Sequence, residues 1–340
     1  METGYLIVDQ FGAFIGKHSE RLQVRKGEEL LQEIPLLNLE GLVIADRGVS
    51  LSADAIAACA DAGIPIHIVH HSGHVCASLF AAGLAGTIET RRAQLLAYDD
   101  HRGLALAKAF ARGKISNQSA LVRYLAKYRK ETQPALYREL GWLAGEILDC
   151  AADLGELSGA TSEEIRLQLL ATEGRAAEKY WQAVRLVVNV PEDWPGRTGR
   201  GATDPVNAAL NYGYGILYAQ VERAVVLAGL DPYAGFIHAD RPGKPSLVLD
   251  LIEEFRVPAV DRVIFAMINR GSKLEMDAEN RLTQPTRRAI AENVLERLDK
   301  PERYERKKMA LQHIIQSQAR HIATFIRGDR PSYKPFLARW

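Results

Sequence analysis

The segment 236–256, FIHADRPGKPSLVLDLIEEFR, concentrates side chains that bind metal ions or move protons. It carries His238 and then three carboxylates in quick succession, at Asp250, Glu253 and Glu254. The spacing predicts that these carboxylates share one face of a helix, just after the loop that bears the histidine. Mixed carboxylate and imidazole ligands suit an exchangeable Mg²⁺ or Mn²⁺ ion better than a closed structural zinc site. The alternative is a solvated acidic patch beside an ordinary loop histidine.

A further carboxylate, Glu173, lies on the apolar stripe of a predicted helix. Leu169 and Leu170 precede it by four and three residues, and Ala176 and Tyr180 follow it at three and seven. Helical residues at these spacings are neighbours, so Glu173 is expected to be buried. A bare buried charge is costly, so this carboxylate must be paired, protonated or bound to a metal. A salt bridge to a nearby arginine is the ordinary explanation and a metal ligand is the functional one.

Four of the nine histidines fall in the segment HIVHHSGH, at His67, His70, His71 and His74. The pattern predicts a strand, a turn and a return strand. Alternation along the first strand would send His67 and His71 to one face and His70 to the other. A zinc site is one interpretation of the cluster, and a polar hairpin is the other.

Other common catalytic signatures are missing from the sequence. It has no GxSxG motif, no phosphate-binding GKS or GKT loop, and no CxxC pair among its three cysteines. The glycines of NYGYG, Gly213 and Gly215, fall inside a predicted helix and favour close helix packing. Without a leader-like start or a long apolar run, we expect a soluble protein of the reducing cytoplasm, with no membrane partner.

Charge is strongly segregated along the chain, although the net charge is only +1. Residues 91–130 hold ten Lys or Arg against two acids, and residues 281–340 hold fourteen against six. Each tract therefore carries +8, and the rest of the chain carries −15. Two basic tracts around an acidic remainder suit a polyanion docked against a carboxylate-bearing centre. The alternative is that these basic residues lie on solvated helix faces.

The elements that must position these residues divide the chain into two unlike parts. Up to about residue 85 the segments are short and β-branched, with one helix at 52–62 capped by Ser52. Beyond about residue 87 the segments are long and periodic at three and four residues. We predict an α+β fold: a β-rich domain at 1–87, a larger all-helical catalytic domain at 88–330, and a fraying tail at 331–340. Helices are expected at 89–114, 116–130, 134–152, 162–188, 205–228, 246–255, 260–269 and 284–325, with a surface loop at 189–203.

Long ordered motifs give the chain a resemblance to one known family. The segments LLATEGRAAEKYW, TDPVNAALNYGYGILYAQVERAVVLAGLDPYAGFIHADRPGKPSLVLDLIEEFR and IPLLNLEGLVIADRGVSLSADAIAACADAGIPIHIV resemble the CRISPR-associated integrase and endonuclease of the spacer-acquisition module. That family is the universal first Cas protein, and the likeness runs over nearly the whole chain.

The resemblance implies a set of metal ligands. The family's Glu in an EGxAA segment, His in a GFxH segment and acid in a DLxE segment fall on Glu173, His238 and Glu253. Asp250 matches a second, supporting catalytic carboxylate, while Glu254 has no assigned role. The histidine-rich hairpin then becomes a local variant and not a second active centre.

The resemblance and the charges together suggest where DNA would lie. We expect phosphate contacts from Arg241, Lys244 and Ser246 beside the metal site, Ser246 also capping the helix that follows it. Arg91 and Arg92 are the expected remote contacts. Tyr180, Tyr212 and Tyr214 either pack beside a DNA end or are ordinary core aromatics.

The family likeness implies a Mg²⁺- or Mn²⁺-dependent adaptation integrase. It would insert short foreign DNA fragments into the CRISPR repeat array, by attack of a 3′-hydroxyl on a phosphodiester, and act as a nuclease on double-stranded and branched DNA. The β-rich domain would make a homodimer, and two dimers would flank a small companion, the second universal Cas protein. A structure-specific repair nuclease and a non-catalytic DNA-binding scaffold are the alternatives.

Overall fold

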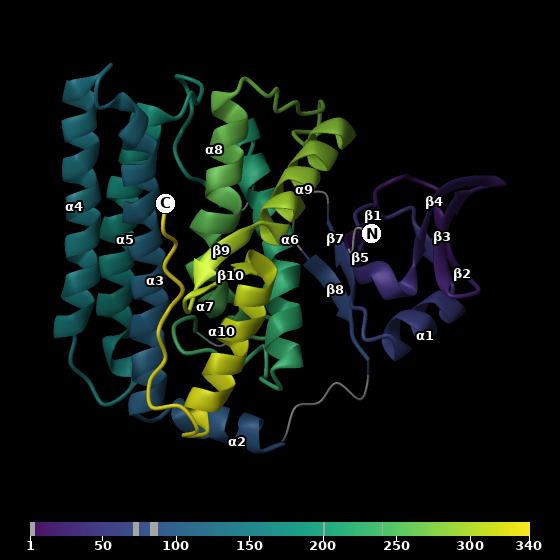
Figure 1. The fold of residues 1–340 in the computed structure, drawn as a ribbon, viewed down its shortest axis with the longest axis horizontal. Helices are drawn as coiled ribbons and strands as arrows, with labels where there is room; N and C mark the ends of the chain where they lie inside the picture. Colours follow the sequence, from purple (N-terminus) through teal and green to yellow (C-terminus); the bar gives the residue numbers. More distant parts are fainter. Residues whose placement is uncertain (1–3, 71–74, 82–87, 200, 240) are drawn as a thin grey trace.

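The computed structural model describes residues 4–70, 75–81, 88–199, 201–239 and 241–340. A small part made of strands lies to one side of a larger part made of long helices (Figure 1). This arrangement confirms the predicted α+β fold with its β-rich region first. Within the described residues, no helix is both long and apolar enough to cross a lipid bilayer.

Two four-stranded sheets and one helix build the N-terminal part. One sheet has the order β1-β5-β7-β8, parallel except for the antiparallel β7–β8 pair, and the other has the order β4-β3-β2-β6. The elements are β1 (Gly4–Val8), β2 (Phe14–His18), β3 (Arg21–Lys26), β4 (Glu29–Pro35), the 3₁₀ turn Leu36–Asn38, β5 (Leu39–Ile44), β6 (Ser50–Leu51), α1 (Ala53–Asp61), β7 (Ile66–Val69) and β8 (Val75–Leu79).

Local sequence explains these elements well. Leu22 and Val24 alternate with exposed or half-exposed neighbours along β3 and enter a core of their own with residues of β5 and α1. Ser52 caps α1 as predicted, since its hydroxyl oxygen accepts a hydrogen bond from the amide of Ala55 at 3.1 Å. Gly63, with φ of +68°, takes the left-handed conformation just past the helix end.

Long helices form the C-terminal part around a second, larger core. Helices α3, α4 and α5 pack side by side at one edge, and α6, α7, α9 and α10 fill the space toward the sheets (Figure 1). The helices are α2 (Ile88–Ala97), α3 (His101–Ala126), the 3₁₀ turn Lys127–Arg129, α4 (Pro134–Glu156), α5 (Ser162–Val187), α6 (Pro205–Leu227), α7 (Ser246–Phe255), the π-helix Arg256–Asp261, α8 (Arg262–Asn269), α9 (Gln284–Asp299) and α10 (Leu311–Ile326).

The expectation of an all-helical C-terminal region is wrong at residues 301–310. The predicted helix 284–325 is interrupted by the antiparallel hairpin of β9 (Pro301–Tyr304) and β10 (Lys307–Ala310). Its turn residues Glu305 and Arg306 have positive φ, a conformation that sequence reasoning assigns to Gly or Asn and not to charged residues. The predicted helix 89–114 also breaks, because the Asp100 carboxylate accepts from the Arg102 amide and starts α3.

The expectation that residues 331–340 fray is also wrong. Tyr333, Phe336 and Ala338 are buried, and the segment runs as an extended strap between α3 and the β9–β10 hairpin (Figure 1). Asn117 of α3 holds it through hydrogen bonds to the carbonyl of Phe336 and from the amide of Ala338. The strap lacks helical or strand periodicity, so nothing in its sequence announces this packing.

Candidate metal centre

Four side chains from four elements meet where α3, α5 and α7 cross. Helix α5 supplies Glu173, α7 supplies Glu253, the loop before α7 supplies His238, and α3 supplies Lys114. The Lys114 ammonium lies 3.3 Å from Glu173 Oε1 and 3.0 Å from Glu253 Oε2. The two carboxylates that the sequence placed on separate helices therefore face a single cation.

Burial and charge act in opposite directions at this junction. Burial would raise the pKa of Glu253, but Arg256 and Lys114 together lower it to about 2. The pKa of Glu173 is raised because its burial outweighs the attraction of Lys114. Burial disfavours the charge on Lys114, yet the carboxylates of Glu253 and Glu173 raise its pKa overall. The Lys114 ammonium is thus stabilised in a buried position by the carboxylates of Glu253 and Glu173.

Asp250 holds the loop that carries His238. One of its oxygens accepts from the amides of Phe236 and Ile237, at 2.5 and 3.0 Å. The other accepts from the His238 amide at 3.1 Å and lies 2.7 Å from His238 Nδ1. A proton on Nδ1, shared with this carboxylate, leaves the lone pair of Nε2 available to a ligand. Asp250 is fully buried and contacts the His238 ring from the protein interior.

The three carboxylates of α7 do not form one cluster, although their spacing places them on the same side of the helix. Helix α7 is buried almost all round, so each acid meets a different partner. Glu254 accepts hydrogen bonds from the Tyr333 hydroxyl at 2.6 Å, and from the Gln318 side chain and the Phe336 amide at 2.8 Å each. Burial raises the pKa of Glu254 to about 7. Glu254 therefore anchors the C-terminal strap and stands outside the metal centre.

The π-helix Arg256–Asp261 directly follows α7 and adds charged side chains to this junction. Arg256 Nη2 lies 3.2 Å from Glu253 Oε1, and its guanidinium lies 5.0 Å from the centre of the Tyr214 ring. At the other end of the π-helix, Asp261 accepts from the hydroxyls of Tyr180 and Tyr214, at 2.6 and 2.5 Å. Such wide turns occur often at functional sites. Tyr180 is fully buried here, whereas Tyr214 keeps some exposure.

The residues at this junction fit a divalent cation. Glu173 Oε1 and Glu253 Oε2 are buried oxygens that face the Lys114 ammonium, and no other donor satisfies either of them in the described residues. Across the described part of the chain, no three His, Cys, Asp or Glu side chains are yet close enough to hold a metal ion together. The two acids converge on the position of the Lys114 ammonium, and His238 lies near enough to act electrostatically on both of them.

The expected DNA contacts lie on two neighbouring surfaces, with one exception. Arg91 and Arg92 are exposed on α2, and Arg241 is exposed on the loop before α7. Helix α2 is tied to that loop by Gln94, whose side-chain amide donates to the carbonyls of residues 231 and 234. Lys244 is partly exposed beside Arg241 and lines the same shallow hollow.

Ser246 does not match its expected roles. It is fully buried, so it is unsuited to a phosphate contact, and it opens α7 as the first helical residue instead of capping it. Pro245 occupies the cap position, and the Ser246 hydroxyl donates only a long hydrogen bond, 3.4 Å, to the carbonyl of Lys244. A serine followed by an apolar run resembles a cap, which explains the error.

The histidine cluster gives no support to a zinc site where it is described. His67 is fully buried in β7 and pairs with Ser78 of β8, the predicted return strand, with Nδ1 2.9 Å from the Ser78 hydroxyl. His71 and His74, with the predicted turn, lie outside the described residues. Sequence reasoning missed Lys114 and Arg256, since a lysine in a basic helix and an arginine after two glutamates look solvated.

Comparison with known proteins adds independent information. The sequence model of the family described as CRISPR associated protein Cas1 matches residues 6–296. A CRISPR-associated endonuclease Cas1 of Archaeoglobus fulgidus is 37% identical over 98% of this chain and 99% of its own length. Among solved structures, a casposase bound to its integration product has a TM-score of 0.82 at 24% identity, covering 98% of this chain and 93% of its own. A Cas6-RT-Cas1–Cas2 complex scores 0.75 at 21% identity, and the match covers 99% of this chain but 36% of that one.

Proposed function

Because this chain belongs to the Cas1 family of CRISPR-associated endonucleases, we propose that it is the integrase of CRISPR adaptation. It would insert short foreign DNA fragments into the repeat array and cut branched DNA with the same site. The observation that carries the proposal is the convergence of Glu173 and Glu253 on one cation position beside an oriented His238. The fold likeness to a casposase bound to an integration product agrees with it.

The proposed reaction exchanges one phosphodiester for another. A bond forms between phosphorus and the 3′ oxygen of the fragment, the bond to the leaving 3′ oxygen of the repeat breaks, and the proton of the attacking hydroxyl ends on the leaving oxygen. When bound, Mg²⁺ or Mn²⁺ would polarise the phosphoryl group and stabilise the leaving oxygen. Glu173 Oε1, Glu253 Oε2 and His238 Nε2 would hold that ion.

Other side chains would prepare the site. Asp250 fixes the ring of His238, so its nitrogen donor is oriented before DNA arrives. Arg256 keeps Glu253 ionised and therefore ready to bind a cation. Lys114 balances the two acids and would share its position with the incoming metal or turn toward a phosphate oxygen. Arg91, Arg92, Arg241 and Lys244 would guide the DNA.

The proposal includes the assembly. We propose that residues 1–87 form a dimerisation domain and residues 88–330 the catalytic domain, in keeping with their two separate cores. The homodimer would bind a small companion protein, as the fold likeness to a Cas1–Cas2 complex suggests. A cytoplasmic location follows from a DNA target in the CRISPR array.

A strand-transfer assay on a supercoiled repeat plasmid tests the function. With Mn²⁺ or Mg²⁺, and with the companion protein present, the wild type should join a fragment to the plasmid, and EDTA should abolish joining. Glu173→Ala should lose joining by more than about a hundredfold while dimer formation and DNA binding persist. The matched control is Glu178→Ala, an exposed acid on the same helix, which should join normally.

The same assay separates the alternatives. Cleavage of branched DNA without any joining would point to the repair nuclease instead. Neither cleavage nor joining, with DNA binding retained, would leave only the scaffold. If Glu173→Ala still integrates fragments, the assignment of the metal centre is wrong.

A further inference from the structure

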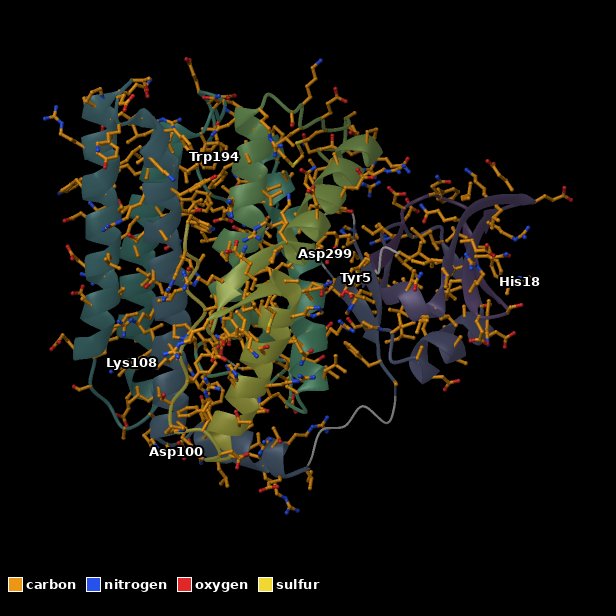
Figure 2. The ribbon with its side chains drawn as sticks, in the orientation of Figure 1. Tyr5, His18, Asp100, Lys108, Trp194 and Asp299 are labelled. Atoms are coloured by element: carbon orange, nitrogen blue, oxygen red, sulfur yellow. The ribbon has the colours of Figure 1, made fainter. Side chains whose placement is uncertain are left out.

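A basic hollow of about 950 Å³ lies on the side of α3 that faces away from the metal centre. Its walls are α3, the end of α4, the turn of the β9–β10 hairpin and the C-terminal strap. Arg112 lines this hollow, whereas Lys114, two residues on and so about 200° around the helix, turns to the two glutamates. The hollow is therefore a separate feature of the molecule. Lys108, near its α3 wall, is labelled in Figure 2.

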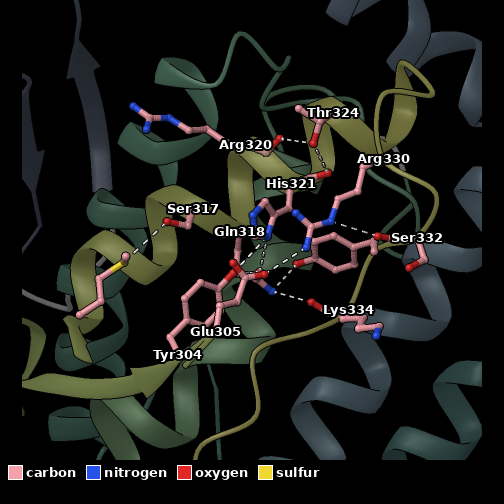
Figure 3. Close-up of polar contacts among 12 residues, drawn as sticks. Tyr304, Glu305, Ser317, Gln318, Arg320, His321, Thr324, Arg330, Ser332 and Lys334 are labelled. Atoms are coloured by element: carbon pink, nitrogen blue, oxygen red, sulfur yellow. Dashed lines mark hydrogen bonds and ion pairs between the residues drawn. The ribbon is translucent and has the colours of Figure 1, made fainter. Parts of the chain in front are cut away.

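Positive charge dominates the lining. Seven Lys or Arg side chains line the hollow against a single carboxylate, Glu305. That carboxylate is paired with Arg330 at 3.1 Å, as Figure 3 shows, and the Lys108 ammonium donates to the carbonyl of Leu157. In the described ranges, no acid lies within ion-pair distance of the other five, all exposed: Arg112, Arg303, Arg306, Lys334 and Arg339.

The hairpin turn fixes part of this charge at the rim. Glu305 and Arg306 have φ of +43° and +69°, conformations that cost a non-glycine residue energy. A two-residue hairpin turn of this kind normally uses Asn or Gly. The contact of Glu305 with Arg330, the residue just before the strap, ties the turn to the chain there, so the turn between Arg303 and Arg306 is held beside the hollow.

The two basic tracts of the sequence meet here. Helix α3 belongs to the tract 91–130, and the hairpin and strap belong to the tract 281–340. Chain segments more than 150 residues apart thus bring seven cations together, with only Glu305 among the lining residues to neutralise one of them. Like charges repel, so such an arrangement is stabilised when an anion binds between them.

We propose that this basic hollow binds a single nucleic-acid strand, with phosphates on its rim and one base over its floor. Five of the seven cations are arginines, whose planar forks bind phosphate oxygens two at a time. Apolar side chains, among them Ala109, Leu154 and Leu337, also line the hollow and can pack against a base, and the volume suits a nucleotide better than a duplex. This inference rests on the proposed function, in which the chain handles DNA.

The test measures the binding of a fluorescein-labelled single strand about 10 nucleotides long, by anisotropy at several salt concentrations. The variant Arg303→Ala/Arg339→Ala removes two exposed cations of the rim. We expect roughly tenfold weaker binding at low salt and a slope of log Kd against log salt reduced by about 1.4. Arg320→Ala is the matched control, an exposed arginine of the same basic tract on α10 that lies outside the hollow lining. It should bind like the wild type.

Each other outcome would overturn the proposal. Unchanged affinity and salt slope in the double variant would show that the hollow does not bind the strand. Loss of binding to labelled polyglutamate, with oligonucleotide binding unchanged, would assign the hollow to an acidic protein instead. Strand transfer by the wild type is measured in parallel. Its failure would count against the proposed function, whereas normal transfer with unchanged binding in the variant would count against this inference alone.

Discussion

At the scale of single residues, one ammonium lies between the two buried carboxylates of the candidate metal centre. Spacing placed Glu173 on an apolar stripe and His238 near Glu253, and the structure brings these residues to one junction. Spacing could not identify Lys114, because its contacts depend on how α3 crosses α5 and α7. Spacing alone also could not show which of Glu253 and Glu254 belongs to the candidate metal site. Helix α7 is buried nearly all round, so two adjacent residues contact different elements.

Lys114→Met tests whether this ammonium stabilises the two carboxylates, because the substitution removes the charge and keeps most of the side-chain length. Two buried acids would then lack their shared cation, and we expect the free energy of unfolding without metal to fall by about 3 kcal/mol. Mn²⁺ should raise the melting temperature of the variant more than that of the wild type, because the metal replaces the lost charge. Differential scanning calorimetry measures both effects.

The control for this substitution is Lys127→Met, which removes an exposed lysine just after the same helix. It should change neither stability nor the Mn²⁺ response by much. Equal Mn²⁺ responses in Lys114→Met and the wild type would mean that the glutamates do not form a cation site.

At the scale of elements, periodicity identified most helices but not their interruptions. The break before α3 depends on the Asp100 cap, and the β9–β10 hairpin depends on a turn of charged residues with positive φ. The strap at 331–340 is ordered by Asn117 and Glu254, which lie far away in sequence. The strap therefore depends on tertiary contacts, which no local pattern contains. The cap and the turn are local, but neither interrupts the helical periodicity of the sequence.

Close packing of α6 against the π-helix agrees with the sequence-based expectation that Gly213 favours close helix packing. A Cβ atom on Gly213 would lie 2.6 Å from Val260 Cγ1, closer than carbon atoms can approach. Gly213→Ala should therefore lower the free energy of unfolding by about 1–3 kcal/mol, as overpacking does. Urea denaturation measures this change.

Gly141→Ala on α4 is the matched substitution, because nothing lies within 4 Å of the added methyl group. It should stabilise the protein by about 0.5–1 kcal/mol, through helix propensity alone. If Gly213→Ala stabilised the protein to the same extent, the two helices would not be in the close contact described.

At the scale of the whole molecule, a polar seam joins the N-terminal sheet to the helical part. The Tyr5 hydroxyl, labelled at this boundary in Figure 2, donates to Gln220 Oε1 of α6 at 2.7 Å. Ser78 of β8 donates to Glu222 of the same helix, and His67 Nδ1 lies 2.9 Å from the Ser78 hydroxyl. Because these groups are mostly buried, their hydrogen bonds help to hold the two parts together.

His67 should make stability fall in mild acid. Burial and then Arg223 lower its pKa to about 4, so between pH 6.5 and 4 the unfolded chain binds a proton that the folded chain refuses. Its contribution is complete above pH 6.5 and is lost as the pH falls through 4, by at most about 3 kcal/mol. Glu222 acts oppositely, since burial raises its pKa and its protonation favours the folded state in acid.

The comparison with His67→Gln isolates the histidine from Glu222, which both proteins retain. Glutamine keeps a polar group near Ser78 but does not titrate, so urea unfolding of the variant should lose less stability between pH 7 and pH 5 than the wild type. Equal losses of stability in the two proteins would mean that the pKa of His67 does not change on folding. The pH dependence of stability would then come from other titratable groups and not from His67 of β7.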